Sequence, residues 1–589
     1  MFIQLTFVSD VAIIPPDSDG DKMRFSKTFV PVGIVLAVFL VFTGCAAVKP
    51  TNALFASTGG DGMVVSVNPI ASQIGMEVLR SGGNAVDAAI ATGFALGVVN
   101  QYNCGLGGGT FIVIRMADGT VHTIDGREMA PSAATRDMYI RDGEFDPSLS
   151  QRGPLAAGVP GVPAAYLKAL ELEGTKPLND LLVSSIAVAR NGFELTEKYI
   201  SSYEQATEYL RQDPASAAIY FHEDGSQLEA GDIFKQPDLA ETYEKLSQLG
   251  LDYFYRGEFA QRTAKYMKEN GGLISEEDMA NYRAVVRAPV VGQYRGYTVI
   301  GMPPPSSGGV HVLQMLNMIE ASKVLDGETQ WSGKTTFRVA QFMERAFQDR
   351  AEFLGDMDYY PVPVERLISK DYAASLVDEI MTASAKVRQP TAEVALEPGH
   401  TTNFCVIDRQ GNAVAINHTV NLTYGAMVTV PGTGVVLNCE MDDFSARPGV
   451  PNFFGLIGSE ANAIEPGKRP LSSMSPTIVV KNDRSVMVLG GSGGPRIITG
   501  VLQTLIGVLD FNLPLRDAVE MPRFHHQYKP EALFVEPGLS DLHRTVLRER
   551  GFELKERDGL GRVRVIVWDK KNQTYRGYAD GVGIGPVAY

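Results

Sequence analysis

The sequence has 589 residues, of which 44% are hydrophobic and 21% are charged, so the composition is that of a globular protein and excludes a largely disordered chain. Its length suffices for two or more domains with a large core. The formal net charge of -15 argues against a nucleic-acid partner, because proteins that bind phosphate backbones usually carry basic patches. Small substrates are not excluded, because the charge at a site can oppose that of the whole chain.

The first part of the chain reads as a targeting sequence. Residues 1–22 contain four aspartates, which is unlike the start of a secretory signal, so we expect a non-native leader and a true start at Met23. A short basic stretch then precedes an apolar run over 29–42, which is shorter than the ~20 residues that span a bilayer comfortably. This order of basic, apolar and small residues predicts an exported protein.

Cys45 directly follows Thr-Gly at the end of that run, as in a bacterial lipoprotein signal over 23–45. Phe42 stands where that pattern usually has leucine, and an uncleaved anchor or an incidental Cys45 are the alternatives. We predict that Cys45 carries lipid, that 46–61 is a tether, and that the protein lies in the bacterial periplasm or at the cell surface, attached to a membrane.

The four cysteines form no CxxC pair and no Cys/His cluster with the spacing of metal ligands. A structural zinc site and a disulfide-built fold are therefore not expected, and we predict no metal and no other cofactor. One disulfide stays open in an oxidising compartment, among Cys104, Cys405 and Cys439.

The chain up to residue 400 is mainly helical in pattern. Small and apolar residues recur at helical spacing over 71–79 and 85–98, with a Ser-Gly-Gly-Asn break between them. A glycine run then leads into a β-rich stretch at 110–115. The later segments are amphipathic helix over most of 165–285, strands near 288–302 and helices to about 383.

The pattern changes after Thr401. Two strands at 404–408 and 413–417 flank Arg-Gln-Gly-Asn, which is a hairpin signature. Strands and helices in separate runs favour an α+β layered fold over a doubly wound parallel sheet. Further strands are predicted at 434–437, 477–480 and 485–489, and helices at 499–509 and 515–520.

Thr401 carries chemistry only if the peptide bond between His400 and Thr401 is broken. In an uncut chain, the two threonines at 401–402 would be the ordinary start of a strand. A free N-terminal threonine holds a hydroxyl nucleophile and an α-amine on one residue, and the amine's pKa of ~7.7–8.0 suits a general base near neutral pH. Thr401 is therefore a candidate nucleophile in an enzyme that cuts itself.

A set of motifs in chain order resembles the gamma-glutamyltranspeptidase family. Two of them are Pro-Pro-Pro-Ser-Ser-Gly-Gly at 303–309 and Pro-Leu-Ser-Ser-Met-Ser-Pro-Thr at 470–477. One such motif is weak, but the whole set spans about 63–530 and is specific. The other motifs lie at 82–89, 125–131, 401–402, 419–421, 440–445, 493–494 and 523–527.

The resemblance implies an N-terminal-nucleophile hydrolase fold, a four-layer αββα sandwich formed by two chains cut from one precursor. The large subunit would be 62–400 and the small catalytic subunit 401–589, joined as a heterodimer. The implied reaction passes the γ-glutamyl group of glutathione and related compounds, through a γ-glutamyl-Thr401 intermediate, to water or to an amino acid or peptide. The preferred acceptor stays open.

The resemblance also implies catalytic roles. Thr401 attacks first its own preceding peptide bond and later the γ-amide carbonyl of the substrate, while Thr419 orients its hydroxyl. Gly493 and Gly494 supply backbone N–H groups to the oxyanion, because glycine permits a close backbone approach. Read by themselves, these two glycines are an ordinary turn before a helix.

A γ-glutamyl group ends in a free amino-acid moiety, so its pocket has to bind an ammonium and a carboxylate. Arg127 offers a planar fork for the carboxylate, beside the hydroxyls of Ser472 and Ser473. Without the resemblance, the arginine would be interpreted as part of a structural ion pair and the two serines as loop residues. The acidic residues named next would be interpreted as caps of a turn. The residues implied for the ammonium are Asn421, Glu440 and Asp443.

Two departures from the family pattern affect the site. Gly-Ser at 491–492 stands where relatives have Ser/Thr-Pro, so we expect a less restrained oxyanion loop and lower turnover. Phe454 replaces a tyrosine whose hydroxyl reaches the residue that matches Asn421, so we expect a cover without that hydrogen bond.

Two other functions stay open. A related acylase of different acyl specificity would keep the fold and the nucleophile, but the joint retention of the pocket residues argues against it. An inactive surface lipoprotein that keeps the fold as a binding module is supported only by the departure at 491–492. Release of a C-terminal chain that begins at Thr401 would separate the last reading from the others.

Overall fold

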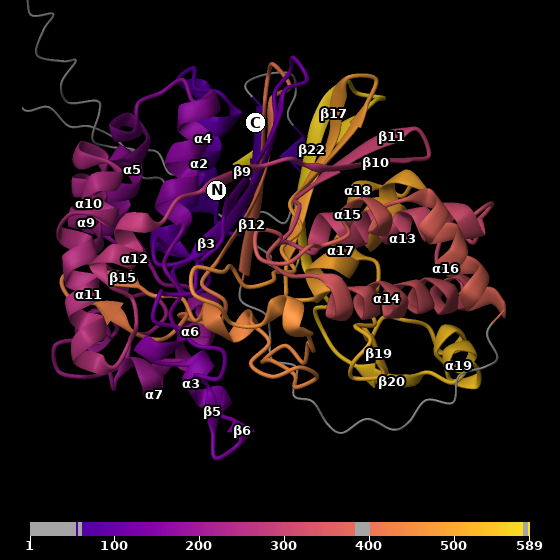
Figure 1. The fold of residues 1–589 in the computed structure, drawn as a ribbon. Coiled ribbons are helices and arrows are strands. Elements are labelled where there is room, and N and C mark those ends of the chain that lie inside the picture. Colours follow the sequence, from indigo (N-terminus) through magenta and orange to yellow (C-terminus); the bar gives the residue numbers. More distant parts are fainter. Residues whose placement is uncertain (1–54, 57–61, 383–400, 581–586, 589) are drawn as a thin grey trace, which may run out of the picture. The chain divides into compact units, whose positions relative to one another are not determined.

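Two seven-stranded sheets lie face to face in the middle of the fold, and helices cover the outer face of each (Figure 1). The computed structural model describes residues 55–56, 62–382, 401–580 and 587–588, which all belong to one unit over 50–589. The predicted αββα sandwich is therefore confirmed.

The first sheet has the predicted hairpin at its centre. β12 (Thr401–Asp408) and β13 (Ala413–Thr419) pair antiparallel, and their partners on either side are β2 (Gly62–Val65) and β3 (Gly109–Arg115). Every residue of β12, β13 and β3 is buried, because this sheet is covered on both faces. The full order is β23 (Val587–Ala588), β2, β12, β13, β3, β4 (Val121–Gly126) and β9 (Val285–Arg287).

The second sheet contains the strands predicted near 288–302, 477–480 and 485–489. Two of its strands, β21 and β22 from the end of the chain, were not assigned from the sequence, although Arg-Val-Arg-Val at 562–565 alternates with a period of two. The order is β1 (Phe55–Ala56), β22 (Thr574–Ala579), β21 (Arg562–Asp569), β17 (Arg484–Ser492), β16 (Thr477–Lys481), β11 (Tyr297–Gly301) and β10 (Val290–Tyr294).

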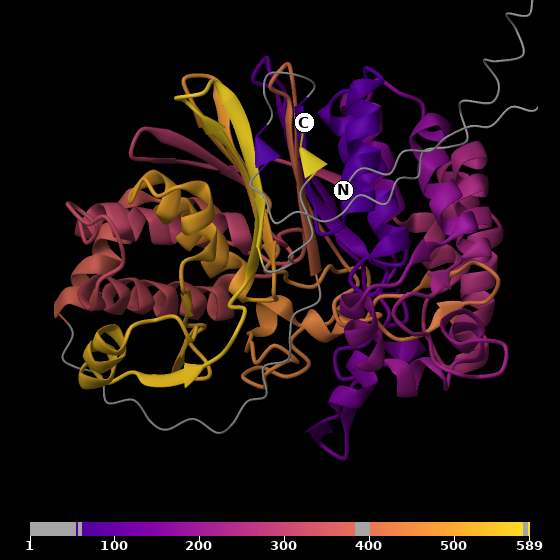
Figure 2. The ribbon, with the colours of Figure 1, turned by 180° about the vertical axis from the view of Figure 1, so that it is seen from behind.

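Strands from before and after residue 401 alternate in both sheets. In the first sheet, β12 and β13 lie between β2 and β3, and in the second, β16 pairs with β11. Figure 2 shows the same mixing from behind, where the orange and yellow strands of the C-terminal part lie among indigo and magenta strands. The two predicted subunits therefore share both sheets.

Two predicted helices cover the first sheet. α1 (Pro69–Arg80) and α2 (Ala85–Val99) match the predicted pair, and Asn84 caps α2 in a reciprocal box with Asp87. All of α2 is buried, because its small residues allow close packing on β12 and β13. The second sheet is covered by α13 (Gly308–Ser322) and α17 (Arg496–Leu509), and α14 (Gly333–Phe353) packs against α13.

Most of the remaining helices confirm the mainly helical prediction for 165–285 and for the stretch that ends near 383, and another confirms the helix predicted at 515–520. They are α3 (Pro147–Gln151), α4 (Val162–Glu173), α5 (Leu178–Asn191), α6 (Glu197–Glu204), α7 (Thr207–Leu210), α8 (Pro214–Tyr220), α9 (Pro237–Leu249), α10 (Leu251–Tyr255), α11 (Glu258–Asn270), α12 (Glu276–Asn281), α15 (Val364–Leu367), α16 (Lys370–Thr382), α18 (Leu515–Glu520) and α19 (Asp541–Glu549).

Short strands form four smaller sheets. Only two residues of the strand predicted at 434–437 form a strand, and they pair with another two-residue strand. The strands are β5 (Ile140–Arg141) with β6 (Glu144–Phe145), β7 (Phe193–Glu194) with β8 (Ile233–Phe234), β14 (Thr429–Val430) with β15 (Val435–Val436), and β18 (Phe524–His525) with β19 (Ala532–Val535) and β20 (Glu553–Glu556).

The disulfide that the sequence left open among Cys104, Cys405 and Cys439 does not form. Cys104, Cys405 and Cys439 are all buried and all carry free thiols, and burial raises the pKa of each. Cys45 and His400 lie outside the described residues, as do the signal and nearly all of the tether. Among the helices that the structure describes, none combines the length and the apolar character needed to cross a bilayer.

Candidate active site

Thr401 and Thr419 face each other at one end of the central hairpin. Thr401 is the first residue of β12, Thr419 is the last of β13, and the antiparallel register pairs them. Their hydroxyl oxygens are 3.3 Å apart. The backbone N–H of Asn421 donates to the Thr419 hydroxyl at 2.9 Å, which holds that hydroxyl beside Thr401. The structure thus brings the predicted nucleophile and its predicted partner together.

Asn421 is held in the left-handed region, with φ of 75°, which asparagine tolerates better than most residues. Its side-chain amide donates to the carbonyl of Cys439 at 2.9 Å. That bond ties the end of β13 to the turn that carries Glu440 and Asp443, a 3₁₀ segment over Glu440–Asp443. The predicted ammonium ligands are therefore neighbours in the fold.

Arg127 follows directly after β4 and is completely buried. Its guanidinium donates to the carboxylates of Glu440 and Asp443, and its Nε donates to the carbonyl of Pro470 at 3.0 Å. Glu128 lies 3.7 Å away as a third carboxylate. The predicted carboxylate ligand is thus in direct contact with two residues predicted to bind the ammonium.

Three carboxylates and one arginine make this cluster electronegative. Burial raises the pKa of Glu128 to about 7, and it raises the pKa of Glu440 well above its usual value, while Arg127 opposes both shifts. Because the acids outnumber the arginine, the cluster favours an additional cation such as an ammonium.

Ser472 and Ser473 lie on a segment that is fixed by the motif at 303–309. Ser472 donates its N–H to the carbonyl of Pro305 at 2.8 Å, and the Ser307 hydroxyl donates to the Ser472 carbonyl at 2.7 Å. Two motifs far apart in the sequence therefore build one wall of the site.

Arg350 is a site residue that the sequence analysis missed. It lies near the end of α14, is 4% exposed, and donates to the hydroxyls of Ser307 at 3.1 Å and Ser473 at 3.2 Å. Among the described residues no acid lies within ion-pair distance, and burial lowers its pKa to about 10. The available signal was its position on the apolar face of the helix, three residues after Phe347.

These side chains line one small cavity, whose volume of about 20 Å³ holds about one water molecule. Apolar residues complete its wall, among them Phe454 and Leu456, so the predicted cover by Phe454 is present. The polar lining residues are Arg127, Arg350, Thr401, Thr419, Asn421, Glu440, Asp443, Ser472 and Ser473, together with the backbone of Gly494.

Gly493 and Gly494 form the junction between β17 and α17. Both are buried, and their φ values of 129° and 60° lie where glycine is favoured. Neither backbone N–H has an acceptor among the described residues, although buried N–H groups are nearly always paired. A Cβ atom on Gly494 would come within 2.7 Å of the Phe454 ring. The junction therefore presents two unpaired amides at a helix N-terminus, which suits an anion.

The residues before this junction are restrained in a way that the sequence analysis did not anticipate. Gly491 and Ser492 end β17 in register with β21, and the Gly491 carbonyl accepts a hydrogen bond from Asn417 at 2.6 Å. The Ser492 hydroxyl accepts another from Arg564 at 2.7 Å. The strand ladder thus restrains the chain before the junction, and the departure no longer supports an inactive protein.

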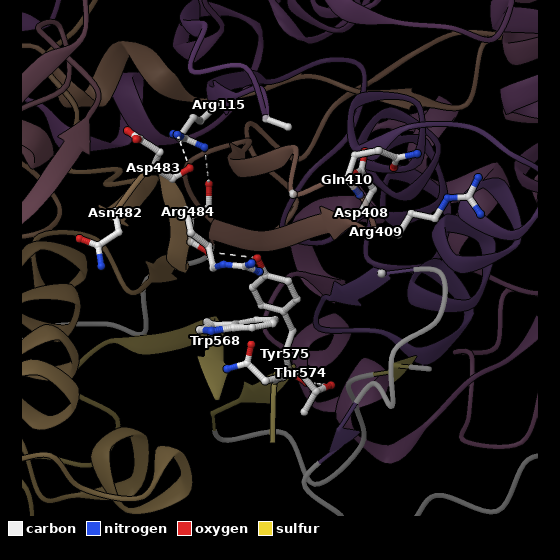
Figure 3. A pocket seen from close by; sticks show the side chains of 15 residues that line it. Arg115, Asp408, Arg409, Gln410, Asn482, Asp483, Arg484, Trp568, Thr574 and Tyr575 are labelled. Atoms are coloured by element: carbon white, nitrogen blue, oxygen red, sulfur yellow. Dashed lines mark hydrogen bonds between the residues drawn. The ribbon is translucent and has the colours of Figure 1, made fainter. Parts of the chain in front are cut away.

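A wider cavity of about 730 Å³ lies at the opposite end of the sheets, among the hairpin turns (Figure 3). Two of its arginines contact other residues of the cavity wall. Arg115 donates to Ser485 and to the carbonyl of Asp483, and Arg484 lies 4.0 Å from the centre of the Trp568 ring. It brings none of the predicted catalytic residues together, so size alone does not identify the site.

The sequence pattern of the gamma-glutamyltranspeptidase family matches residues 71–589. The chain belongs to this family. A glutathione hydrolase proenzyme from Escherichia coli is 42% identical over 524 residues, which cover 87% of this chain and 89% of that protein. One from Pseudomonas aeruginosa is 38% identical over 553 residues, covering 92% and 98%.

Solved structures agree with this family and with its fold. A cephalosporin acylase from Bacillus halodurans superposes with a TM-score of 0.79 at 25% identity, covering 93% of this chain and 99% of that one. The gamma-glutamyltranspeptidase of Helicobacter pylori gives 0.53 at 40% identity, covering 57% and 94%. This gamma-glutamyltranspeptidase is therefore an autoprocessing transferase and glutathione hydrolase with a threonine nucleophile, made as one precursor of two subunits.

Proposed function

We propose that Thr401 is the nucleophile for both the self-cutting and the γ-glutamyl transfer of this enzyme. One observation carries the assignment: the Thr401 hydroxyl lies 3.3 Å from that of Thr419, in the cavity that also holds Arg127 and the acids. A hydroxyl nucleophile at the first residue of a strand, next to an orienting hydroxyl, fits the chemistry of an N-terminal threonine.

In the self-cutting step, the Thr401 oxygen attacks the carbonyl carbon of residue 400 and the amide C–N bond breaks. An ester replaces the amide, and water hydrolyses the ester. The products are a carboxylate on residue 400 and a free α-amine on Thr401.

The proposal also includes export of the protein and attachment of lipid at Cys45. Both are supported by the order of basic, apolar and small residues in 23–45.

In the transfer step, the α-amine takes the proton of the Thr401 hydroxyl as the oxygen bonds to the γ-carbonyl carbon of the substrate. The amine then gives that proton to the leaving amine, and a γ-glutamyl ester remains on Thr401. Water or the amine of an amino acid or peptide attacks the ester and restores the hydroxyl. The two unpaired N–H groups of Gly493 and Gly494 receive the oxyanion.

Binding of the γ-glutamyl group exchanges ion pairs within the donor cavity. Its carboxylate takes Arg127, with hydroxyl donors from Ser472 and Ser473, and its ammonium takes Glu440 and Asp443. Arg127 thus exchanges carboxylates of the protein for the carboxylate of the substrate, and Glu440 and Asp443 exchange the guanidinium for the ammonium of the substrate. No buried ion is left without a counter-ion. Asn421 offers its side-chain oxygen to the same ammonium.

Replacement of Thr401 by alanine tests this proposal. The unaltered protein is expected to give two bands on a denaturing gel, and Edman sequencing of the smaller chain should start at Thr401. The Thr401→Ala variant should stay as one chain and should not release nitroaniline from a γ-glutamyl nitroanilide. A cut or active Thr401→Ala variant would overturn the assignment.

A further inference from the structure

A second cavity opens beside Thr401. Its volume is about 400 Å³, and of the described residues Thr401 alone lines both this cavity and the donor cavity. The glycine junction separates the two, because Gly493 lines the second cavity and Gly494 the first. A substrate whose γ-glutamyl part fills the donor cavity therefore has this second cavity available for the group on the other side of the reacting bond.

The second cavity is strongly basic, although the whole chain carries a net charge of -15. Five cationic side chains line it, and Asp558 is its single acid among the described residues. This local reversal of charge is unlike a solvated protein surface, where both signs are interspersed. The cations are Lys198, Arg496, Arg557, Arg562 and Arg564.

Arg564 is the buried part of this wall. It is 2% exposed, and it donates to the Ser492 hydroxyl at 2.7 Å and to the carbonyl of Arg562 at 3.0 Å. Its Nε has no hydrogen-bond partner, and no acid in the described part of the chain lies within ion-pair distance. A buried cation without a counter-ion is costly, so the site favours an anion.

Lys198 and Arg562 face the same cavity from different elements. Lys198 lies in the first turn of α6, and Arg562 starts β21 two residues before Arg564, which places both arginines on one face of the strand. In the part of the chain that is described, neither has an acid within ion-pair distance. Burial lowers the pKa of Lys198 to about 7, and the charges of Arg564 and Arg562 add to this shift.

We propose that this basic cleft, formed by Lys198, Arg562 and Arg564, binds a carboxylate of the molecule whose amine leaves Thr401 or attacks it. The ligand class is an amino acid or short peptide with a free carboxylate, either as the leaving group of the donor or as the acceptor. The inference rests on the proposed function of Thr401. It adds a prediction about substrate preference: the enzyme prefers compounds that carry a carboxylate near the reacting amine over matched neutral compounds.

The leaving-group arm of the test compares two donors that differ by one carboxylate. They are γ-glutamyl-4-nitroanilide and γ-glutamyl-3-carboxy-4-nitroanilide, both assayed without acceptor at pH 7. The double variant Lys198→Gln/Arg562→Gln is expected to lower the ratio of kcat/KM, carboxylated over neutral, by about tenfold. Effects common to both donors cancel in this ratio.

The acceptor arm uses one donor, the neutral anilide, with glycylglycine or glycylglycinamide as acceptor. The same double variant should lower the ratio of transfer rates, carboxylate over amide, by a similar factor. A fall in only one arm assigns the cleft to the leaving group or to the acceptor respectively. Lys570→Gln/Lys571→Gln is the matched control, because it removes two positive charges at the far end of β21 and should leave both ratios unchanged.

Unchanged ratios in both arms for a folded, cut double variant would overturn this inference. The single variants Lys198→Gln and Arg562→Gln guard against a folding defect, since each should lower the ratio by a smaller factor, and circular dichroism reports their fold. Failure of the proposed function gives a different result, because then the Thr401→Ala variant would still be cut or would still turn over the neutral anilide.

Discussion

Glu128 shows how strongly burial acts on a single residue of this protein. The carboxylate lies 3.7 Å from Arg127, and both of its oxygens lack a hydrogen-bond partner among the described residues. Its pKa in the folded protein is about 7, against 4.5 in the unfolded chain. Between these pH values the folded state binds more protons, so the free energy of unfolding falls as the pH rises.

The variant Glu128→Gln should therefore be more stable than the unaltered protein at pH 8, by about 2–3 kcal/mol, because glutamine has no charge to bury. The gain should shrink as the pH falls from 7 and should vanish below about 4.5. Thermal unfolding at pH 4, 6 and 8 measures this dependence. Glu549→Gln, at an exposed position of α19, serves as the control, and an equal gain at every pH would contradict the prediction.

Arg350 acts as a positioning residue, because its guanidinium holds the hydroxyl of Ser473 beside the donor cavity. Replacement by methionine should raise KM for the γ-glutamyl donor by about tenfold, with a smaller effect on kcat, since the role proposed for Ser473 is binding of the donor in the ground state. Arg350→Lys should recover part of the loss. Arg338→Met, on the same helix, is the control, and a loss confined to kcat would contradict the assignment.

At the scale of elements, the junction between β17 and α17 sets the geometry of the two amides that we propose as the oxyanion site. Gly494 has a φ of 60° and lies against Phe454, whereas Gly500, six residues further along and inside α17, has no neighbour closer than 3.5 Å to an added Cβ. The two glycines therefore differ in what a methyl group costs, although both belong to the same short segment.

Gly494→Ala is expected to lower kcat by about a hundredfold, because the side chain would displace Phe454 and strain the amides proposed to receive the oxyanion. Gly500→Ala should leave kcat unchanged and should raise the stability slightly, as alanine does in a helix interior. Steady-state kinetics of both variants decide the matter. Equal kcat for the two variants would show that the junction tolerates side chains.

At the scale of the whole molecule, the cut does not divide the protein into two separate cores. β12 and β13 come from the C-terminal part and lie between β2 and β3 from the N-terminal part. Separation of the chains would expose strand edges on both sides of β12–β13 and would open a buried core.

The cut protein should therefore elute as one species in size-exclusion chromatography under native conditions, with both chains in the same peak. The chains should part only in denaturant, at the concentration where the tryptophan fluorescence reports unfolding. Elution of the smaller chain by itself in native buffer would contradict this shared core.

The sequence by itself determined most of the local elements and indicated the residue that we propose as the nucleophile. Helical spacing predicted α1 and α2, and the hairpin signature predicted β12 and β13, because such patterns depend on neighbours in the chain. Motifs in chain order pointed to Thr401 and to the residues that gather around it. The strands β21 and β22 were missed, although the alternation in β21 was readable.

Only the tertiary structure decided which charges meet. It paired Arg127 with Glu440 and Asp443, and it brought Arg350 to Ser473. It also placed Lys198 beside β21, far along the chain. The physical reason is that the free energy of a charge depends on burial and on the nearest counter-charge, and both are set by segments that are distant in sequence.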